Sequence, residues 1–309
     1  MLLSSSFDFL SLYLSIELQS LCLYVLAAFN RKSAYSTEAG LKYFVLGAFS
    51  SGFLLFGISL IYGFTGIINF EDLRFLLSFD FSLQPSIILG IIFISCALFF
   101  KISAAPFHIG TPDIYDGSPI PSTIFFSTIP KIGFLLIILR VFIFSFGFQI
   151  KMWQILFCFS ALTSIFIGSF LALKQRKLKR LFAYSSISHV GYLFLGCSSG
   201  GLEGIHASLM YLIIYVITSF GIWSIIISLN NLIKQVKFRV LSDFSSINKS
   251  NPLLALSCAL FLFSIAGTPP LAGFYVKFYL FLVSVNASIY INSLLILLIN
   301  VISTYYYIR

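Results

Sequence analysis

Long apolar runs are the feature that most limits how this 309-residue chain can fold. A helix needs about 20 consecutive apolar residues to cross a bilayer. We count nine such spans: 8–29, 39–63, 86–107, 122–147, 151–173, 181–198, 204–229, 252–286 and 287–308. Only 9% of the residues are charged, against about 25% in soluble domains. The runs predict an all-α polytopic membrane protein in which residues 1–309 form a single membrane domain.

One of these spans, 252–286, contains a break. Two adjacent prolines, Pro269 and Pro270, follow Gly267 and Thr268 inside it. Each proline removes a backbone hydrogen bond, so the helix must be interrupted there. A bilayer tolerates broken backbone only where it is buried in protein or lines a wet cavity. Lys277 follows closely after the break. The broken helix and the buried lysine together predict a site at which a charge is moved.

The span 86–107 is irregular in a similar way. After Lys101 it runs into AAPFHIGTPDIYDGSPIP, where Pro106 is the first of four prolines. Both irregular spans place a lysine near a proline-rich break, five spans apart. This spacing predicts two inverted five-helix repeats, 8–147 (incomplete) and 151–308, an arrangement used by many transporters.

Four ionisable residues lie deep inside the spans: Glu17, Lys101, Lys131 and Lys277. Each costs roughly 2.5–3.5 kcal/mol at mid-bilayer on insertion scales. Lys131 directly follows Pro130, which predicts a further helix break beside the charge. One interpretation is structural, with Glu17 and one lysine paired between helices and the other lysines reaching the surface. The other is a proton path.

A proton path needs groups that gain and lose protons. A buried lysine can lose its proton because burial disfavours the charged form, and a nearby carboxylate opposes this. Arginine cannot take this role, since it does not deprotonate. If Glu17 approaches Lys101, movement of either group changes the proton affinity of the other. Lys101, Lys131 and Lys277 would then load and unload in turn.

Two histidines are candidate proton relays between these lysines. His108 lies in the proline-rich segment after Lys101, and His189 lies in the middle of the span 181–198. A lone histidine in a span is about as often a hydrogen-bonded contact between helices, so both interpretations remain open.

The loops predict the orientation. The loops after the first, third, fifth and seventh spans hold eleven basic residues, and the other loops hold two. The eleven are Arg31, Lys32, those of KQRKLKR at 174–180, Lys234, Lys237, Arg239 and Lys249. The positive-inside rule places these loops and the C-terminus on the matrix or cytoplasmic side. The tyrosine-rich end, TYYYIR, predicts an interfacial aromatic belt.

Several classes of function are disfavoured. The five cysteines have no metal or redox spacing, and no cluster of His, Cys and carboxylates predicts a metal or a bound cofactor. The net charge of +9 is explained by topology and lipid contact, and no basic patch with interleaved aromatic residues predicts nucleic-acid binding. The first residues lack a signal or transit peptide pattern.

Three stretches carry a specific resemblance to a known family. They are SIELQSLCLYVLAAFNRKSAYSTEAGLKYFVLGAFSSGFLLFG at 15–57, FKISAAPFHIGTPDIYDGSPIPSTIFFSTIPKIGF at 100–134 and SIAGTPPLAGFYVKFYLF at 264–281. In this order they resemble the antiporter-like membrane-arm subunits of respiratory complex I, in particular subunit 2 of mitochondrial NADH dehydrogenase. The resemblance covers almost the whole chain.

The resemblance implies a function and a location. It implies proton pumping coupled to NADH:ubiquinone oxidoreduction in the mitochondrial inner membrane, where the orientation given by the basic loops places the C-terminus on the matrix side. NADH, FMN, iron–sulfur clusters and ubiquinone would bind to other subunits. By position, the family's proton-translocating residues match Glu17, Lys101, Lys131 and Lys277, the same four that the bilayer argument selects.

The family pattern has more helices than this chain. The glutamate-bearing span is here the first, so the family's first helices and its last helix have no counterpart. We expect either a split subunit, with a second polypeptide supplying the opening helices, or lipid and neighbouring subunits in their place, and we favour the split subunit. The alternative functions are a related cation/proton antiporter or complex I-like enzyme, and a non-pumping scaffold of the membrane arm.

Overall fold

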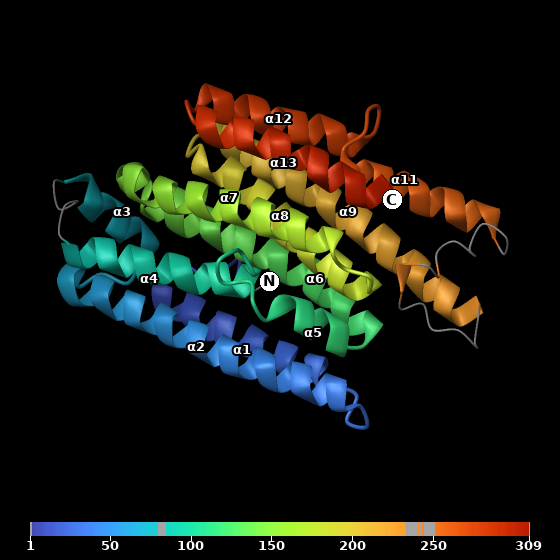
Figure 1. The fold of residues 1–309 in the computed structure, drawn as a ribbon. Helices are drawn as coiled ribbons and strands as arrows, with labels where there is room; N and C mark the ends of the chain where they lie inside the picture. Colours follow the sequence, from blue (N-terminus) through green and yellow to red (C-terminus); the bar gives the residue numbers. More distant parts are fainter. Residues whose placement is uncertain (1, 80–84, 233–239, 242, 244–250, 309) are drawn as a thin grey trace. The chain divides into compact units, whose positions relative to one another are not determined.

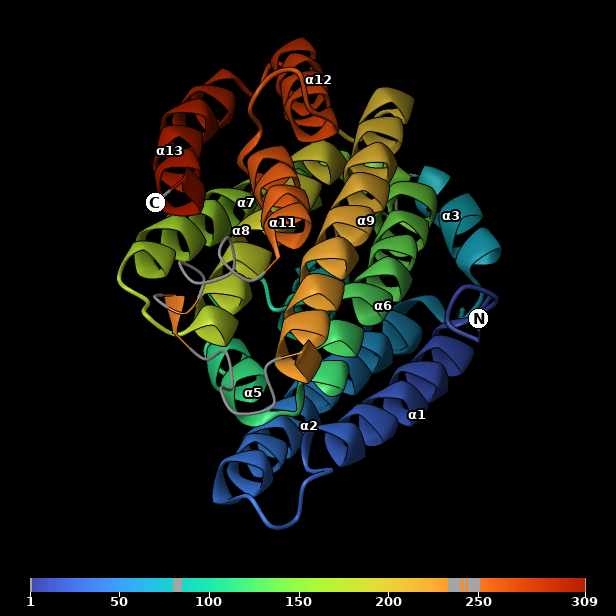
Figure 2. The same cartoon turned by 90° about the vertical axis from the view of Figure 1, so that its right-hand side faces the viewer.

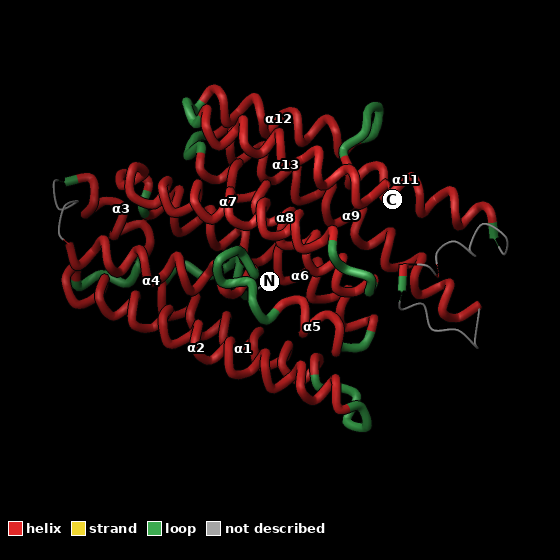
Figure 3. The backbone as a smooth tube through the Cα atoms, in the orientation of Figure 1, coloured by secondary structure: helices red, strands yellow, loops and turns green. Residues whose placement is uncertain are grey.

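Helices and loops make up the computed structural model, which describes residues 2–79, 85–232, 240–241, 243 and 251–308 (Figure 1). In chain order the helices are α1 (Phe9–Ala27), α2 (Ala34–Thr65), α3 (Phe70–Ser78), α4 (Pro85–Ile102), α5 (Thr111–Gly117), α6 (Ile120–Ile138), η2 (Leu139–Ser145), η3 (Gly147–Gln149), α7 (Ile150–Leu173), α8 (Leu178–Ser198), α9 (Leu202–Leu232), α11 (Pro252–Ala266), α12 (Ala272–Asn286) and α13 (Tyr290–Ile308). Figure 3 draws no strand in the described part. The predicted loop residues Lys234, Lys237, Arg239 and Lys249 lie outside it.

The helices coincide with the predicted spans. Seven of the described helical segments are long and apolar enough to cross a membrane: α1, α2, α4, α6 with η2, η3 with α7, α9 up to Asn230, and α13. The remaining two predicted spans correspond to α8 and to the broken span, which consists of α11 and α12. The helices α11 and α12 are each only 15 residues long. The all-α polytopic fold is therefore confirmed.

The chain divides into two units by its internal contacts. The first unit consists of Met1–Pro119 and Ile129–Ser160, and the second of Ile120–Thr128 and Ala161–Arg309. The predicted inverted repeats, 8–147 and 151–308, are a statement about internal symmetry and stay a prediction.

In the first unit, α2 packs against α1, α4 and α5 (Figure 1). Glycines allow α2 and α4 to approach closely, because a Cβ added to Gly57 would lie 3.0 Å from the Gly90 carbonyl oxygen. In membranes the hydrophobic effect does not drive helices together, because lipid tails are as apolar as the helix surface. Close packing through small residues is therefore a usual means of helix association. The close contact holds α4, and with it Lys101, against α2.

The irregular span of the first unit ends its helix directly after Lys101. The last residue of α4 is Ile102, and Ser103 adopts a left-handed conformation with φ of 68°. Pro106 lies in the loop that follows, before the short helix α5. The lysine thus stands at the C-terminal end of a helix, where carbonyl groups favour a cation.

The predicted break at Pro130 is wrong. Pro130 lies inside α6, which continues from Ile120 to Ile138. Proline lacks the N–H that would bond to the carbonyl four residues earlier, so one backbone bond is missing. In transmembrane helices such a freed group can be satisfied by neighbouring groups without ending the helix. The proline opens the hydrogen-bond ladder beside Lys131 and leaves the helix intact.

In the second unit, α9 packs against α8, α11 and α12, and Figure 2 shows α9 and α11 side by side. The broken span ends its first half at Ala266, and Gly267 caps α11 with φ of 83°. Only glycine adopts this conformation without strain. The second half, α12, starts at Ala272 after the loop that contains Pro269 and Pro270.

Buried apolar side chains from α7, α8, α9, α11 and α13 form the core of the second unit. Its members are Ala172, Leu178, Leu181, Phe182, Ile222, Trp223, Ile225, Ile226, Leu229, Cys258, Ile265, Ala266, Tyr306 and Tyr307. Ala266, the last residue before the break, is completely buried. The residues that lead into the break are therefore enclosed by protein, whereas Pro269 and Pro270 themselves are exposed on this chain.

Candidate proton-translocation site

Lys101 and Glu17 form an ion pair in the first unit. Lys101 Nζ lies 3.8 Å from Glu17 Oε1, and the lysine side chain is only 6% exposed. Lys101 also donates a long hydrogen bond of 3.5 Å to the Gly47 carbonyl. The pair joins α1 to the end of α4. The proton-path interpretation required Glu17 to approach Lys101, and the structure shows that it does.

Gly47 leaves space for this arrangement. A Cβ at this position would overlap the hydroxyl group of Tyr24. The Tyr24 ring is itself held by edge contacts to Tyr43 at 4.9 Å and Phe44 at 5.6 Å between ring centroids. The glycine thus allows a tyrosine from α1 to approach α2 at the residue whose carbonyl faces Lys101.

Lys131 and His108 also belong to the first unit. Lys131 is 4% exposed in α6. His108 lies half-buried in the loop between α4 and α5. Its Nδ1 is buried, and no hydrogen-bond partner for that atom is present among the described residues. His108 thus lies in the segment that follows Lys101, with one ring nitrogen that has no hydrogen-bond partner in the described part of the chain.

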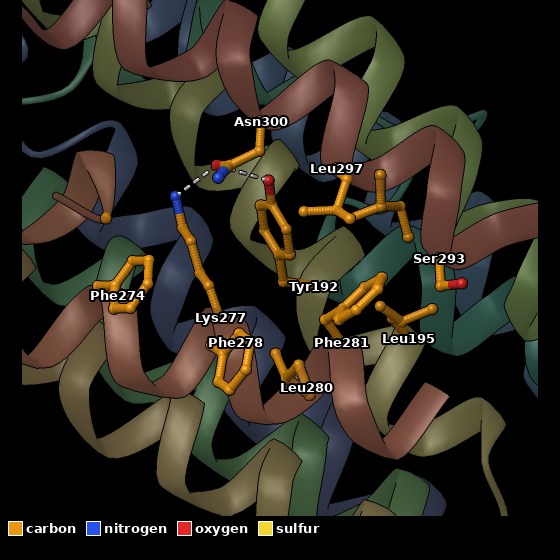
Figure 4. A pocket seen from close by; sticks show the side chains of 12 residues that line it. Tyr192, Leu195, Phe274, Lys277, Phe278, Leu280, Phe281, Ser293, Leu297 and Asn300 are labelled. Atoms are coloured by element: carbon orange, nitrogen blue, oxygen red, sulfur yellow. Dashed lines mark hydrogen bonds between the residues drawn. The ribbon is translucent and has the colours of Figure 1, made fainter. Parts of the chain in front are cut away.

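Lys277 lies in the second unit, on the first turns of α12. Its Nζ donates to the Ala266 carbonyl at 3.0 Å and to Asn300 Oδ1 at 2.9 Å. It also lies 5.2 Å from the centroid of the Tyr192 ring, within the range of a cation–π interaction. Figure 4 shows Lys277 and Tyr192 both directed towards Asn300. The carbonyl that the helix break leaves free is thus used to bind the lysine.

Two cavities border Lys277. One has a volume of about 210 Å³ and is lined mainly by apolar side chains, with Tyr192, Asn300 and Ser293 as its other polar residues. The second has a volume of about 20 Å³, and His189 contributes to its lining. A cavity of roughly 10–15 Å³ can already hold one water molecule. The lysine therefore stands between two spaces large enough for water.

His189 is bonded on both ring nitrogens. Nδ1 lies 2.6 Å from the Tyr211 hydroxyl, and Nε2 lies 3.1 Å from the Tyr307 hydroxyl.

The predicted aromatic belt at the C-terminus is wrong for two of its residues, because Tyr306 and Tyr307 are each only 7% exposed. They face the helix core, since the hydroxyl of Tyr307 has a partner there, whereas Tyr305 is 61% exposed.

Four polar groups at this site were not predicted from the sequence: Asn300, Tyr192, Tyr211 and Tyr307. Asn300 is an amide within the otherwise apolar stretch 294–302 of α13, and that signal was available. The tyrosines gave no such signal, because tyrosine is common in membrane helices and only its packing shows whether the hydroxyl is used. Among the described residues no cluster of three or more His, Cys, Asp and Glu residues could hold a metal ion.

The fold and site together define a class: a polytopic helical membrane protein with buried lysines at helix interruptions. Ionisable residues at such positions mark substrate or ion pathways in membrane proteins. The family model described as "NADH:quinone oxidoreductase/Mrp antiporter, TM" matches residues 6–303. The chain therefore belongs to the NADH:quinone oxidoreductase/Mrp antiporter family of transmembrane subunits.

The curated relatives are respiratory proteins. The chain is 48% identical over 310 residues to NADH-ubiquinone oxidoreductase chain 2 of Marchantia polymorpha, covering 99% of this chain and 62% of the relative. It is 45% identical over 313 residues to NADH-quinone oxidoreductase subunit N of Paramagnetospirillum magneticum, covering 100% of this chain and 64% of that one. The chain thus spans somewhat less than two thirds of the length of these relatives.

Solved structures have the same fold. A chain of respiratory complex I from Thermus thermophilus with bound aureothin matches with a TM-score of 0.83 and 32% identity, covering 99% of this chain and 66% of that chain. A chain of the Mrp complex from Dietzia matches with a TM-score of 0.88, covering 98% and 56%. Its identity is only 22%, so this second likeness shows the fold alone.

Proposed function

We propose that this chain is a proton-translocating part of the membrane arm of respiratory complex I, coupling NADH:ubiquinone oxidoreduction to proton pumping. The names and 48% and 45% identities of its relatives support this proposal. The observation that carries it is the position of Lys277, which stands at a helix break and borders two cavities. A buried amine that borders two cavities can accept a proton from water in one and release it to water in the other.

At Lys277, the charged and neutral forms of the amine have different partners. As an ammonium group it donates to Ala266 and Asn300. After it gives its proton to a water molecule in either cavity, the neutral amine no longer needs both acceptors. The cost of a buried charge in a membrane makes this deprotonation accessible.

At Lys101, the carboxylate of Glu17 is the group that favours the charged form. An opposite charge at 3.8 Å stabilises the ammonium. Any movement that separates α1 from the end of α4 would release the proton from Lys101. The ion pair is therefore the element through which a conformational change would drive the transfer.

Lys131 and the two histidines would complete the path. Lys131 would accept and release protons as the third lysine of the path, and His189 and His108 would relay them. His189 is suited to this because hydroxyl groups face both of its ring nitrogens. The two inverted repeats, 8–147 and 151–308, would each contribute one broken helix.

The remaining components would lie outside this chain. NADH, FMN, iron–sulfur clusters and ubiquinone would be bound by other subunits of complex I, and the neighbours of this chain would be other membrane-arm subunits and lipids. The basic loops support an orientation with the C-terminus on the matrix side. The relative from Marchantia polymorpha, an NADH-ubiquinone oxidoreductase chain, supports the mitochondrial inner membrane as the location.

A second candidate function is cation/proton exchange. The family description includes Mrp antiporters, and the buried lysines would serve that activity equally. The two candidates differ in their energy source. Proton movement in the first depends on NADH and quinone, and in the second on a cation gradient. A non-pumping scaffold is the third reading, in which Lys277 has a purely structural role.

The test is NADH-driven proton uptake in sealed membranes that contain the complete complex, with assembly checked on native gels. Lys277→Arg keeps a positive charge and hydrogen-bond donors but cannot release a proton. Lys277→Met keeps the length without charge. The matched control is Lys42→Met, a lysine that is exposed in α2.

A proton carrier predicts loss of uptake in both Lys277 variants, with the Lys42 control unchanged. Normal uptake in Lys277→Arg would remove Lys277 from the path and favour the scaffold reading. Uptake that persists without NADH and follows a cation gradient would favour the antiporter reading.

A further inference from the structure

Asn300 is the centre of a hydrogen-bond cluster at the helix break of the second unit. Its Oδ1 accepts from Lys277 Nζ at 2.9 Å, from the Tyr192 hydroxyl at 3.1 Å and from Ser303 Oγ at 3.0 Å. These donors come from α12, α8 and α13. Figure 4 shows the lysine and the tyrosine meeting at this one side chain.

The cluster places the amine relative to the two cavities. Lys277 borders both, but Asn300 and Tyr192 border only the larger one. The bond to Asn300 therefore holds Nζ at the α13 side of the break. The smaller cavity, which His189 lines, is bordered by the same lysine side chain.

We propose that Asn300 is a positioning residue that holds the protonated amine of Lys277 beside the larger cavity and lets it leave when the proton is lost. This inference rests on the proposed function, since it assumes that Lys277 carries protons. It adds the group that determines where the amine lies in its charged state.

The Tyr192 hydroxyl makes release possible. When the amine leaves, Oδ1 still accepts from Tyr192, whereas the single proton of the Ser303 hydroxyl is shared with the nearer Asn300 main-chain carbonyl, at 2.7 Å. No buried acceptor is then left without a partner, a situation that would cost about 1–3 kcal/mol. Asn300 is thus held in place in both states, and only the bond to Lys277 is made and broken.

A neutral acceptor suits this role better than a carboxylate. An amide oxygen binds an ammonium group without a full opposite charge, so it favours the protonated amine only moderately. The titratable groups that face Lys277 from the packed helices are Tyr192 and His189 on α8 and Tyr211 and Tyr215 on α9. No carboxylate lines either cavity in the part of the chain that the structure describes.

Two substitutions of Asn300 test the inference in opposite directions. Asn300→Asp has nearly the same shape but adds a negative charge, which keeps Lys277 protonated up to a higher pH. Asn300→Leu removes the acceptor, so the positive charge of Lys277 loses one of its two hydrogen bonds. The measurement is the pH profile of NADH-driven proton uptake by the assembled complex in sealed membranes.

We expect the pH above which proton uptake declines to rise by about one to three units in Asn300→Asp, the range that a nearby opposite charge produces. In Asn300→Leu we expect this pH to fall. The matched control is Asn292→Leu, which replaces an amide on the same helix that lines neither cavity. Its profile stays that of the parent.

The outcomes separate the two proposals. Normal uptake in Lys277→Arg would refute the proposed function itself. Loss of uptake in Lys277→Arg, with unshifted profiles in both Asn300 variants, would overturn only the positioning role. If one Asn300 variant does not assemble, the direction of the shift in the other decides. Failure of both to assemble, while Asn292→Leu assembles, would assign Asn300 a structural role and also overturn the inference.

Discussion

Replacement of Glu17 by Gln is the sharpest perturbation of the first unit. At 3.8 Å, two unit charges attract each other by about 4 kcal/mol at an effective dielectric constant of about 20. The Glu17 side chain is 26% exposed, so solvent reduces this value. Even about 2 kcal/mol changes the ratio of charged to neutral lysine more than tenfold. The remaining acceptor of Lys101, the Gly47 carbonyl at 3.5 Å, is too distant to compensate.

We therefore expect Glu17→Gln to lower the rate of NADH-driven proton uptake near neutral pH by about tenfold, with assembly preserved. Glu17→Asp, with its carboxylate further from Lys101, should fall between the parent and the glutamine variant. The assay is proton uptake per NADH oxidised in sealed membranes, with native gels as the check on assembly.

The matched control is Glu38→Gln. Glu38 pairs with Lys42 at 2.8 Å, a shorter distance, but both side chains are well exposed, and exposed pairs contribute little. This control should pump normally. If Glu17→Gln assembled and pumped as well as Glu38→Gln, the argument that burial makes the Lys101 pair functional would be refuted.

Two further substitutions have their own controls. Gly47→Ala places a Cβ against the Tyr24 hydroxyl, so we expect it to destabilise the first unit by about 1–3 kcal/mol, seen as a lower thermal midpoint of the complex. Gly52→Ala in the same helix meets open space and should cost nothing; equal midpoints for the two would contradict the packing argument. His189→Phe removes both tyrosine contacts and, if His189 relays protons, should slow uptake by about 100-fold. Tyr305→Phe, at an exposed position, should have no effect, and normal uptake in His189→Phe would exclude the relay.

The fold could be predicted from the chain largely because bilayer helices are local structures. Each apolar run satisfies its own backbone hydrogen bonds, so the positions of α1, α2 and α13 follow from hydrophobicity. The break between α11 and α12 was equally local, since two adjacent prolines and a glycine act on their own neighbours. Pro130 shows the limit of this reasoning, because a single proline removes a bond and the surroundings decide whether the helix ends.

The site could be predicted only in part. Glu17, Lys101 and Lys277 were found because a charge in an apolar run is conspicuous. Asn300 was not predicted because an uncharged amide costs less than a charge in a membrane, so its presence is a weaker indication of function. The role of Tyr307 was misjudged, since an aromatic residue near a helix end fits an interfacial belt as well as a buried hydrogen bond.

The sequence by itself determined that this chain is a bundle of membrane helices, where two of them break, and which charges are buried. It did not determine the partners of those charges. The apolar residues of α1, α2 and α12 are spread around each helix, so no stripe of polarity indicates which face meets a neighbour. The pairing of Glu17 with Lys101 and of Asn300 with Lys277 depends on helix rotation and close packing. Both are set by contacts between distant segments, and for that reason only the tertiary structure decided them.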